Sequence, residues 1–159
     1  MIFITLGSQK FQFNRLLKEV DNLIEEGIIT EEVFAQIGYS DYKPKNYKYK
    51  YFLGRDEFKK IMSESKNVIT HGGTGAIIGA VKNRKKVIAI PRLKEFGEHV
   101  DNHQIQIIDE FSKMNLILAV YSIEELGVAI EKIKNINMNE YRSNTNNIIS
   151  EINNFIKKI

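Results

Sequence analysis

The sequence of 159 residues contains no cysteine and only two prolines. Without cysteine, the chain has no disulfide framework, no thiolate nucleophile and no zinc site of the cysteine type. No apolar run approaches the roughly 20 residues that a membrane span requires. Met1 leads directly into the apolar residues 2–6, which are too few for a secretory signal and lack a basic start. We therefore expect a soluble, cytoplasmic chain.

Neither sign of charge predominates, because the net charge is only +3. The charged fraction of 27% is ordinary for a globular protein. One basic segment, residues 42–51, interleaves lysine with tyrosine, a pattern that can track single-stranded nucleic acid. Residues 48–51, however, alternate like an edge strand whose lysines face outward and protect a free edge. We favour that interpretation and expect no nucleic-acid partner.

Short β-branched runs alternate with amphipathic stretches along most of the chain, which predicts an α/β fold. The expected architecture is a Rossmann-like, doubly wound parallel sheet of about six strands. Strands are expected at residues 2–6, 33–37, 48–51, 68–69, 86–90 and 116–120. Helices are expected at residues 13–26, 56–65, 74–83, 101–114 and 123–133.

The last part of the chain reads differently. We place a Rossmann-like domain at residues 1–135 and a C-terminal segment at 136–159, with one long helix from Asn139. No further sheet remains for this helix to cover, so we expect its apolar stripe to pack on the domain or on a partner subunit. The stripe consists of Ile148, Ile149, Ile152, Phe155, Ile156 and Ile159.

A glycine-rich turn lies near the middle of the chain. The apolar residues 68–69 lead into His71-Gly72-Gly73-Thr74-Gly75, and a helical pattern begins at once, with Thr74 as the expected N-cap. Three glycines in four residues are not explained by packing, and we attribute them to a sharp turn and a close ligand. A helix N-terminus adds free N–H groups and the positive end of a dipole, which suit an anion. The turn alone fits an ordinary strand–helix connection equally well.

A polar segment follows the next expected strand, which ends at Pro91. It contains Glu98, His99, Asp101, Asn102, His103 and Gln104. Loops after successive parallel strands open on the same edge of a sheet, so this segment and the glycine-rich turn should flank one crevice. Phosphate would suit the glycine-rich side, and a ribose or another polyhydroxylated group would suit the amides and carboxylates.

These motifs resemble the C-terminal nucleotide-sugar-binding domain of glycosyltransferase family 28, over roughly residues 1–120. The resemblance is strongest to the small donor-binding subunits of two-part UDP-sugar transferases. Those include the dolichol-linked N-acetylglucosamine transferase and bacterial pairs of capsule and exopolysaccharide synthesis. The segments that carry it are Thr5-Leu-Gly-Ser8, residues 13–17, residues 36–40, His71-Gly-Gly-Thr-Gly75, Ile90-Pro-Arg92 and residues 97–104.

The resemblance implies one lobe of a two-lobed GT-B enzyme, which binds a UDP-sugar and transfers its hexose with inversion to a lipid-linked saccharide. It implies a membrane-associated partner subunit at the inner face of the membrane, which holds the acceptor and supplies the general base. It implies donor-phosphate contacts from Gly7, Ser8, His71, Gly72, Gly73, Thr74 and Gly75. Sugar or ribose contacts are implied for Glu98, His99, Asp101, Asn102, His103 and Gln104, and a backbone contact to uracil near residues 52–55.

The sequence departs from the resembled pattern at Gly79, where many relatives place a glutamate that bonds the ribose. Either Glu98 or Asp101 replaces that carboxylate, or the contact is absent. Arg92 could approach a diphosphate with its planar donors, or form a surface salt bridge.

His99 and His103 are spaced i, i+4, as pairs of zinc-ligating imidazoles often are. The sequence shows no third ligand of the right kind, so we expect no metal and no cofactor besides the UDP-sugar substrate. Two other classes of function stay open. One is a non-catalytic module that enhances or anchors a partner transferase. The other is a different Rossmann nucleotide binder, although Gly7-Ser-Gln lacks the Gly-x-Gly-x-x-Gly pattern.

Overall fold

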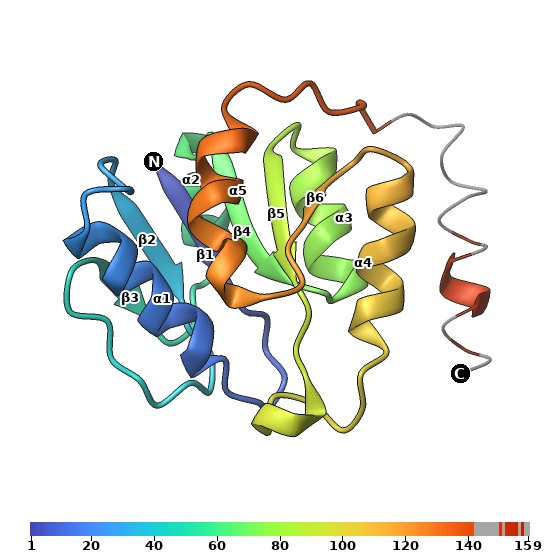
Figure 1. The fold of residues 1–159 in the computed structure, drawn as a ribbon, viewed down its shortest axis with the longest axis horizontal. Coiled ribbons are helices and arrows are strands. Elements are labelled where there is room, and N and C mark those ends of the chain that lie inside the picture. The colour runs from blue at the N-terminus through green and yellow to red at the C-terminus, as the bar shows by residue number, and fades with distance from the viewer. Residues whose placement is uncertain (142–149, 151, 156, 158–159) are drawn as a thin grey trace.

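The computed structural model describes residues 1–141, 150, 152–155 and 157. Within them, six parallel strands form a single sheet in the order β3-β2-β1-β4-β5-β6 (Figure 1). The predicted doubly wound parallel sheet is thus confirmed. The strands are β1 Ile2–Thr5, β2 Val33–Gln36, β3 Lys48–Lys50, β4 Asn67–His71, β5 Lys86–Ile90 and β6 Leu118–Ala119.

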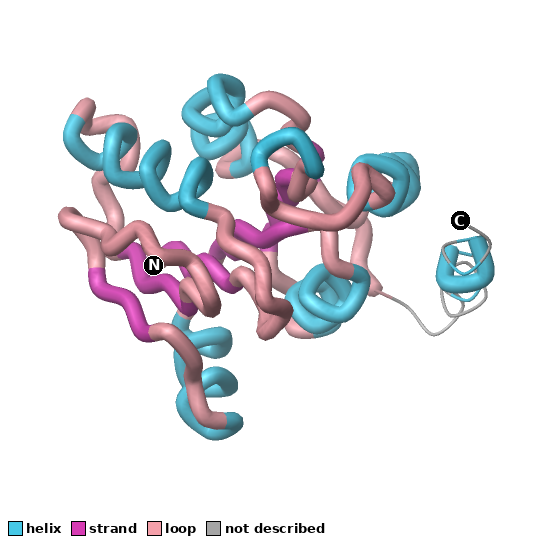
Figure 2. The backbone as a smooth tube through the Cα atoms, turned by 90° about the horizontal axis from the view of Figure 1, so that it is seen from below, coloured by secondary structure: helices cyan, strands magenta, loops and turns pink. Residues whose placement is uncertain are grey.

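Helices cover both faces of the sheet, as the view along its edge shows (Figure 2). The α-helices are α1 Asn14–Glu25, α2 Arg55–Glu64, α3 Thr74–Lys82, α4 Gln104–Lys113 and α5 Leu126–Ile133, and the 3-10 turns are η1 Lys94–Phe96 and η2 Ile123–Glu125. On one face, α1 and α5 pack on strand residues such as Ile4 and Ile88. On the other, α2, α3 and α4 pack on Phe3 and Val87. The inner strands β1, β4 and β5 are rich in apolar residues because both of their faces are buried.

The basic edge strand is confirmed as well. β3 lies at the end of the sheet and pairs only with β2. Lys48 and Lys50 are exposed on it, while Tyr49 between them is half-buried against the core. Outward lysines on an unpaired edge oppose pairing with another chain.

Several element boundaries differ from the sequence-based expectation, and β6 is shorter than expected. The N-cap of α3 is Gly73, and Thr74 is the first helical residue. The helix expected from Asp101 begins at Gln104, because residues 101–103 form bends and a turn. Residues 123–133 divide into η2 and α5.

Residues 136–141 are irregular, so the C-terminal helix does not begin at Asn139. The part of its apolar stripe formed by Ile148, Ile149, Ile156 and Ile159 lies outside the described residues. Of the described stripe residues, Ile152 packs in the core cluster of α3 and α4, whereas Phe155 is exposed. Among the described residues, no helix combines the length and apolar character that crossing a membrane requires.

A buried carboxylate shapes the loop that leads into β3. Asp21 on α1 is 2% exposed. It accepts hydrogen bonds from the Tyr42 hydroxyl at 2.6 Å and from the backbone N–H groups of Lys45 and Asn46 at 2.9 Å each. One carboxylate therefore satisfies three donors that would otherwise be left without partners near the core. The hydrogen bonds to Asp21 hold the inner side of the loop, while its lysines are exposed.

We expect Asp21→Ala to lower the free energy of unfolding by about 3 kcal/mol, because it removes charge-assisted hydrogen bonds and leaves buried donors unpaired. Urea unfolding monitored by circular dichroism measures this change. The matched control is Asp41→Ala, since Asp41 is an exposed carboxylate of the same loop that bonds only the Asn14 side chain. Equal effects of the two substitutions would contradict the role given to Asp21.

Candidate functional site

The strand order reverses between β1 and β4, and the loops that follow these two strands diverge at their carboxyl ends. In open α/β sheets this switch point is where ligands bind. The loop after β1 and the turn η1, which follows β5, meet at the lower edge of the sheet in Figure 1. The side-chain amide of Gln12 donates to the carbonyl of Phe96 at 2.8 Å, which joins them directly. The glycine-rich turn and the polar segment after β5, which the sequence predicted to share one edge, are joined there by the hydrogen bond from the Gly72 N–H to the Gln104 side chain.

Gln104, the first residue of α4, links the turn after β4 with the connection after β5. Its Oε1 atom accepts hydrogen bonds from the N–H of Gly72 at 2.9 Å and from the N–H of Arg92 at 3.0 Å. Its Nε2 atom lies 3.3 Å from Nδ1 of His71. The side chain is 3% exposed. Gln104 was predicted to bind sugar or ribose, and in this structure its amide is used by the protein itself.

The glycines of the turn have different roles. A Cβ atom on Gly72 would lie 2.7 Å from Cβ of Gln104, and one on Gly73 would lie 2.2 Å from Cε1 of His71. These two glycines make room for protein side chains, which corrects the expectation that packing does not explain them. A Cβ on Gly75 would meet no atom within 4 Å. Gly75 is therefore the glycine of this turn that leaves open space for a ligand.

His71 is neutral and has a defined tautomer. Two backbone N–H groups donate to one atom of the Gln104 amide, so that atom is the oxygen. The other atom, Nε2 of Gln104, is the amide nitrogen and can only donate. Nδ1 of His71 then accepts, which leaves the proton on Nε2, facing Gly7. Burial, reinforced by the charge of Arg92, lowers the pKa of His71 to about 3. The ring thus presents an N–H donor beside the loop after β1.

Arg92 is buried and holds the loop after β1 in place. Its guanidinium donates to the carbonyl oxygens of Leu6 at 2.6 Å, Phe11 at 2.9 Å and Gln12 at 3.4 Å. The side chain is 1% exposed, and burial lowers its pKa to about 10. Both expectations for Arg92, a diphosphate contact and a surface salt bridge, are therefore wrong. The residue instead shapes the segment that carries Gly7 and Ser8.

Glu98 also stabilises the loops. Its carboxylate is fully buried and accepts two hydrogen bonds from the Arg15 guanidinium, at 3.1 and 3.0 Å. It accepts a third from the N–H of Leu93 at 3.0 Å. Sequence reasoning missed Arg15, since nothing in the local pattern links it to a loop 83 residues away. With these partners, Glu98 is poorly suited to replace the carboxylate that is missing at Gly79.

The remaining predicted site residues are more accessible. Ser8 is exposed after β1, Thr74 is partly exposed at the start of α3, and Asn102 is exposed, with its Oδ1 accepting from the N–H of Lys94 at 2.8 Å. Asp101 is exposed between His99 and His103, and its carboxylate contacts both rings. The structure thus brings a carboxylate to the histidine pair, an arrangement that the sequence spacing did not reveal.

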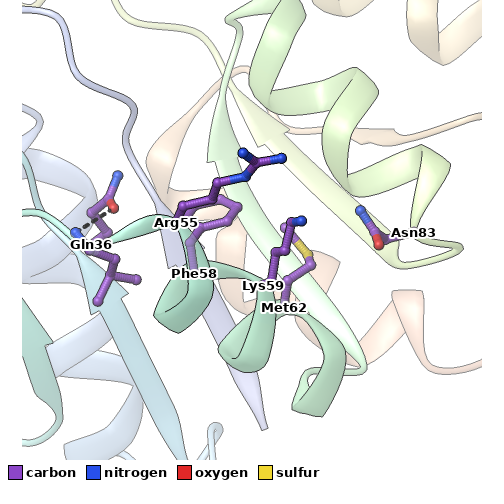
Figure 3. A pocket seen from close by; sticks show the side chains of 7 residues that line it. Gln36, Arg55, Phe58, Lys59, Met62 and Asn83 are labelled. Carbon is purple, nitrogen blue, oxygen red and sulfur yellow. Dashed lines mark hydrogen bonds between the residues drawn. The ribbon is translucent and has the colours of Figure 1, made fainter.

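A pocket of about 620 Å³ opens between α2 and α3, within the size range of small-molecule sites (Figure 3). Asn83 reaches it from the end of α3 and donates to the carbonyl of Gly79 at 2.7 Å, so the pocket adjoins the open face at Gly79. Two cations, Arg55 and Lys59, and no carboxylate are among the lining residues. The pocket is lined by Gln36, Leu53, Arg55, Phe58, Lys59, Met62 and Asn83.

The backbone contact expected for uracil is only partly available there. The N–H of Leu53 donates to Oε1 of Gln36 at 3.0 Å, shown as the dashed line in Figure 3. This donor is therefore already engaged. A base bound beside residues 52–55 would need a different backbone group.

A six-stranded parallel sheet with a glycine-rich strand–helix turn at its switch point defines a Rossmann-like lobe. The family model for the glycosyltransferase family 28 C-terminal domain matches residues 1–159. The chain therefore belongs to glycosyltransferase family 28.

Similar proteins agree with this assignment. The chain is 32% identical over 83 residues to the UDP-N-acetylglucosamine transferase subunit ALG13 of Candida albicans, a match that covers 52% of this chain and 27% of that protein. It is 33% identical over 84 residues to the subunit of the same name from Kluyveromyces lactis, covering 52% and 41%. The matched part is thus less than half of either relative's length.

Solved structures show the same fold at low identity. MurG of Acinetobacter baumannii superposes with a TM-score of 0.58 at 16% identity, covering 83% of this chain and 41% of MurG. The glycotransferase of kitacinnamycin superposes with a TM-score of 0.62 at 12% identity, covering 95% and 37%. The chain therefore has the fold of one lobe of a GT-B glycosyltransferase.

The neutral state of His71 has a measurable consequence for stability. Its pKa rises from about 3 in the folded chain to about 6.5 when unfolded. The stability that comes from keeping His71 neutral is therefore fully present above pH 6.5 and is lost as the pH falls toward 3. Because of His71, we expect the free energy of unfolding to fall by about 2 kcal/mol when the pH is lowered from 7 to 5. Urea titrations of the protein and of His71→Asn at both pH values measure the difference, which should be smaller in the variant. An NMR titration midpoint of His71 near 6.5 would contradict this assignment.

Proposed function

We propose that this chain is the donor-binding catalytic subunit of a two-part, UDP-sugar-dependent, inverting glycosyltransferase. The observation that carries the proposal is the N-terminus of α3 with open space at Gly75, in a chain of glycosyltransferase family 28. The names of the two relatives favour UDP-N-acetylglucosamine as the first donor to test. The acceptor is a lipid-linked saccharide of cell-surface polysaccharide synthesis, held by a membrane-associated partner at the cytoplasmic face.

The contacts within the turn narrow down which groups hold the diphosphate. The N–H of Gly72 is already used by Gln104. The N–H groups of Thr74, Gly75 and Ala76 lie in the first turn of α3, where no intrahelical carbonyl can accept from them. Together with the helix dipole they suit an anion. Nε2–H of His71 and the Thr74 hydroxyl are further donors at this edge.

In the proposed reaction, an acceptor hydroxyl attacks the anomeric carbon of the sugar from the side opposite UDP. The new C–O bond forms as the bond to the β-phosphate breaks, and negative charge develops on the departing UDP. Fixed N–H dipoles at α3 stabilise that charge without having to reorganise, so the transfer as proposed requires no metal. The proton of the acceptor passes to a general base, which we place in the partner because the partner holds the acceptor hydroxyl.

The pocket between α2 and α3 is the proposed nucleoside site. It adjoins Gly79 through Asn83, and its size suits a nucleoside. Phe58 and Met62 give it an apolar wall, and Arg55 and Lys59 supply positive charge toward the phosphates.

Exposed apolar side chains at the same edge of the sheet support a partner lobe. Tyr39 and Phe52 pack edge to face after β2 and β3 and are each about half exposed. Phe96 and Val100 are exposed on the connection after β5, with 50% and 65% of their surfaces accessible. Large apolar groups around a ligand crevice are suited to contact with a second protein surface.

A substitution at Gly75 should weaken ligand binding with little effect on the stability of the fold. Isothermal titration of the chain with UDP-N-acetylglucosamine, UDP-glucose, UDP-galactose, ADP and NAD identifies the donor. We expect Gly75→Val to weaken binding of the preferred UDP-sugar at least about tenfold, because the added methyl groups enter the open space in which phosphate would approach. The melting temperature should stay nearly unchanged, since no atom lies near that Cβ position.

Gly73→Ala is the contrasting variant. Its Cβ would collide with the His71 ring, so this substitution should lower the melting temperature as well as the affinity. If the isolated chain does not bind, the titration is repeated with the partner subunit. Full transferase activity of a reconstituted pair that carries Gly75→Val would argue for a non-catalytic module, and preference for NAD would argue for a different Rossmann binder.

Introducing a glutamate at position 79, where many resembling proteins carry one, tests where the ribose lies. The position has no atom within 4 Å of an added Cβ, so a glutamate can be accommodated. We expect Gly79→Glu to bind UDP about tenfold more tightly, through charge-assisted hydrogen bonds to ribose hydroxyls. Gly79→Ala controls for the change in helix propensity. Equal affinities of the two variants would place the ribose elsewhere.

A further inference from the structure

Three side chains on the connection between β5 and α4 converge on one point. His99, Asp101 and His103 each offer one potential ligand atom, and these atoms lie within 4.8 Å of one another. The convergence arises because residues 101–103 form bends and a turn instead of helix, which folds Asp101 back between the two rings. In a helix the two histidines would share a face, and Asp101 would point away from it.

Hydrogen bonds hold the carboxylate between the imidazoles. Oδ1 of Asp101 accepts from the backbone N–H of His103 at 3.1 Å and forms a short contact with Nδ1 of the same residue. It lies 3.4 Å from Nδ1 of His99. The rings of His99 and His103 meet edge to face, with centroids 4.8 Å apart. One nitrogen of each ring and one carboxylate oxygen therefore lie close enough together to be ligands of a single cation.

One nitrogen of the cluster, Nδ1 of His99, lacks a well-formed hydrogen bond although Oδ1 of Asp101 lies 3.4 Å away. The His99 side chain is 8% exposed, and its buried Nδ1 atom makes no hydrogen bond within the described part of the chain. A buried polar atom without a partner carries a free-energy cost, and such atoms call for a specific explanation. A bound cation at the centre of the cluster would satisfy it.

The orientation of His99 is fixed by the fold. Its ring stacks on Phe11, with centroids 5.1 Å apart and planes 29° from parallel. The carbonyl of Phe11 in turn accepts from buried Arg92. A ring held in this way loses little conformational freedom when a ligand binds, which lowers the cost of binding.

We propose that His99, Asp101 and His103 form a binding site for a divalent transition metal of the zinc type. Two imidazole nitrogens and one carboxylate oxygen suit Zn²⁺ and Co²⁺, whereas Mg²⁺ prefers an all-oxygen set. Three protein ligands leave one position of a tetrahedral site for water. His103 directly precedes Gln104, so a bound metal orders the segment that positions the Gln104 amide at the crevice. This proposal does not depend on the transferase function.

Titration of the full, tag-free chain with Co²⁺ tests the site, with visible absorption reporting ligand geometry and Zn²⁺ as competitor. The sequence has three histidines and no cysteine, so there are few alternative ligands. We expect one equivalent to bind. His103→Ala and Asp101→Asn should each weaken binding by about tenfold or more. Glu95→Gln, which removes an exposed carboxylate of the same connection, is the matched control and should bind as the unaltered chain does.

Thermal unfolding gives an independent readout. Saturating Zn²⁺ should raise the melting temperature of the chain and of Glu95→Gln, because the metal binds only the folded site. It should not raise that of His103→Ala, and Mg²⁺ should have no effect. Far-ultraviolet circular dichroism establishes that the variants are folded. Absence of saturable Co²⁺ binding, or equal binding by folded His103→Ala and Asp101→Asn, would overturn the proposal.

Discussion

The buried amide of Gln104 is the interaction on which the geometry of the crevice depends. It accepts from one N–H in the turn after β4 and from another after β5, and it sets the tautomer of His71. The close approach requires glycine at position 72, and the position of the His71 ring requires glycine at position 73. The turn motif and the first residue of α4 are thus two halves of one packed arrangement. An unpaired backbone N–H in either loop would lower the stability of the fold, because both groups are buried. A substitution in the turn or at Gln104 therefore disturbs the other part as well.

Much of the fold could be predicted from local pattern. β1, β4 and β5 are short apolar runs buried on both faces, and β3 shows the alternation of an edge strand. Such periodicities follow from burial alone. The start of α4 was harder to place, because Asp101, Asn102 and His103 are compatible with a first helical turn. Contacts to residues as distant as Lys94 and His99 favour the bent conformation instead.

The candidate site was predictable in location but less so in the roles of its side chains. Arg92 and Glu98 have the chemistry of ligand-binding residues, yet both are buried in contacts that span about 80 positions of the sequence. A single sequence cannot distinguish an arginine that binds phosphate from one that binds three carbonyl oxygens of its own chain. The same limit applies to the glycines, since only three-dimensional packing separates Gly72 and Gly73 from the open Gly75.

These assignments change which groups remain for a ligand. Because Gln104, Glu98, Arg92 and the N–H of Gly72 are engaged by the protein, the proposed anion site is left with the first turn of α3 and His71. Backbone N–H groups recognise a phosphate without regard to the sugar attached to it. In the proposed function, discrimination among UDP-sugars therefore falls to the few accessible side chains at this edge, such as Thr74 and Asn102, and to the partner surface that closes on it. A subunit built in this way can supply a general donor-phosphate site, while its partner determines the acceptor and completes the selection of the sugar.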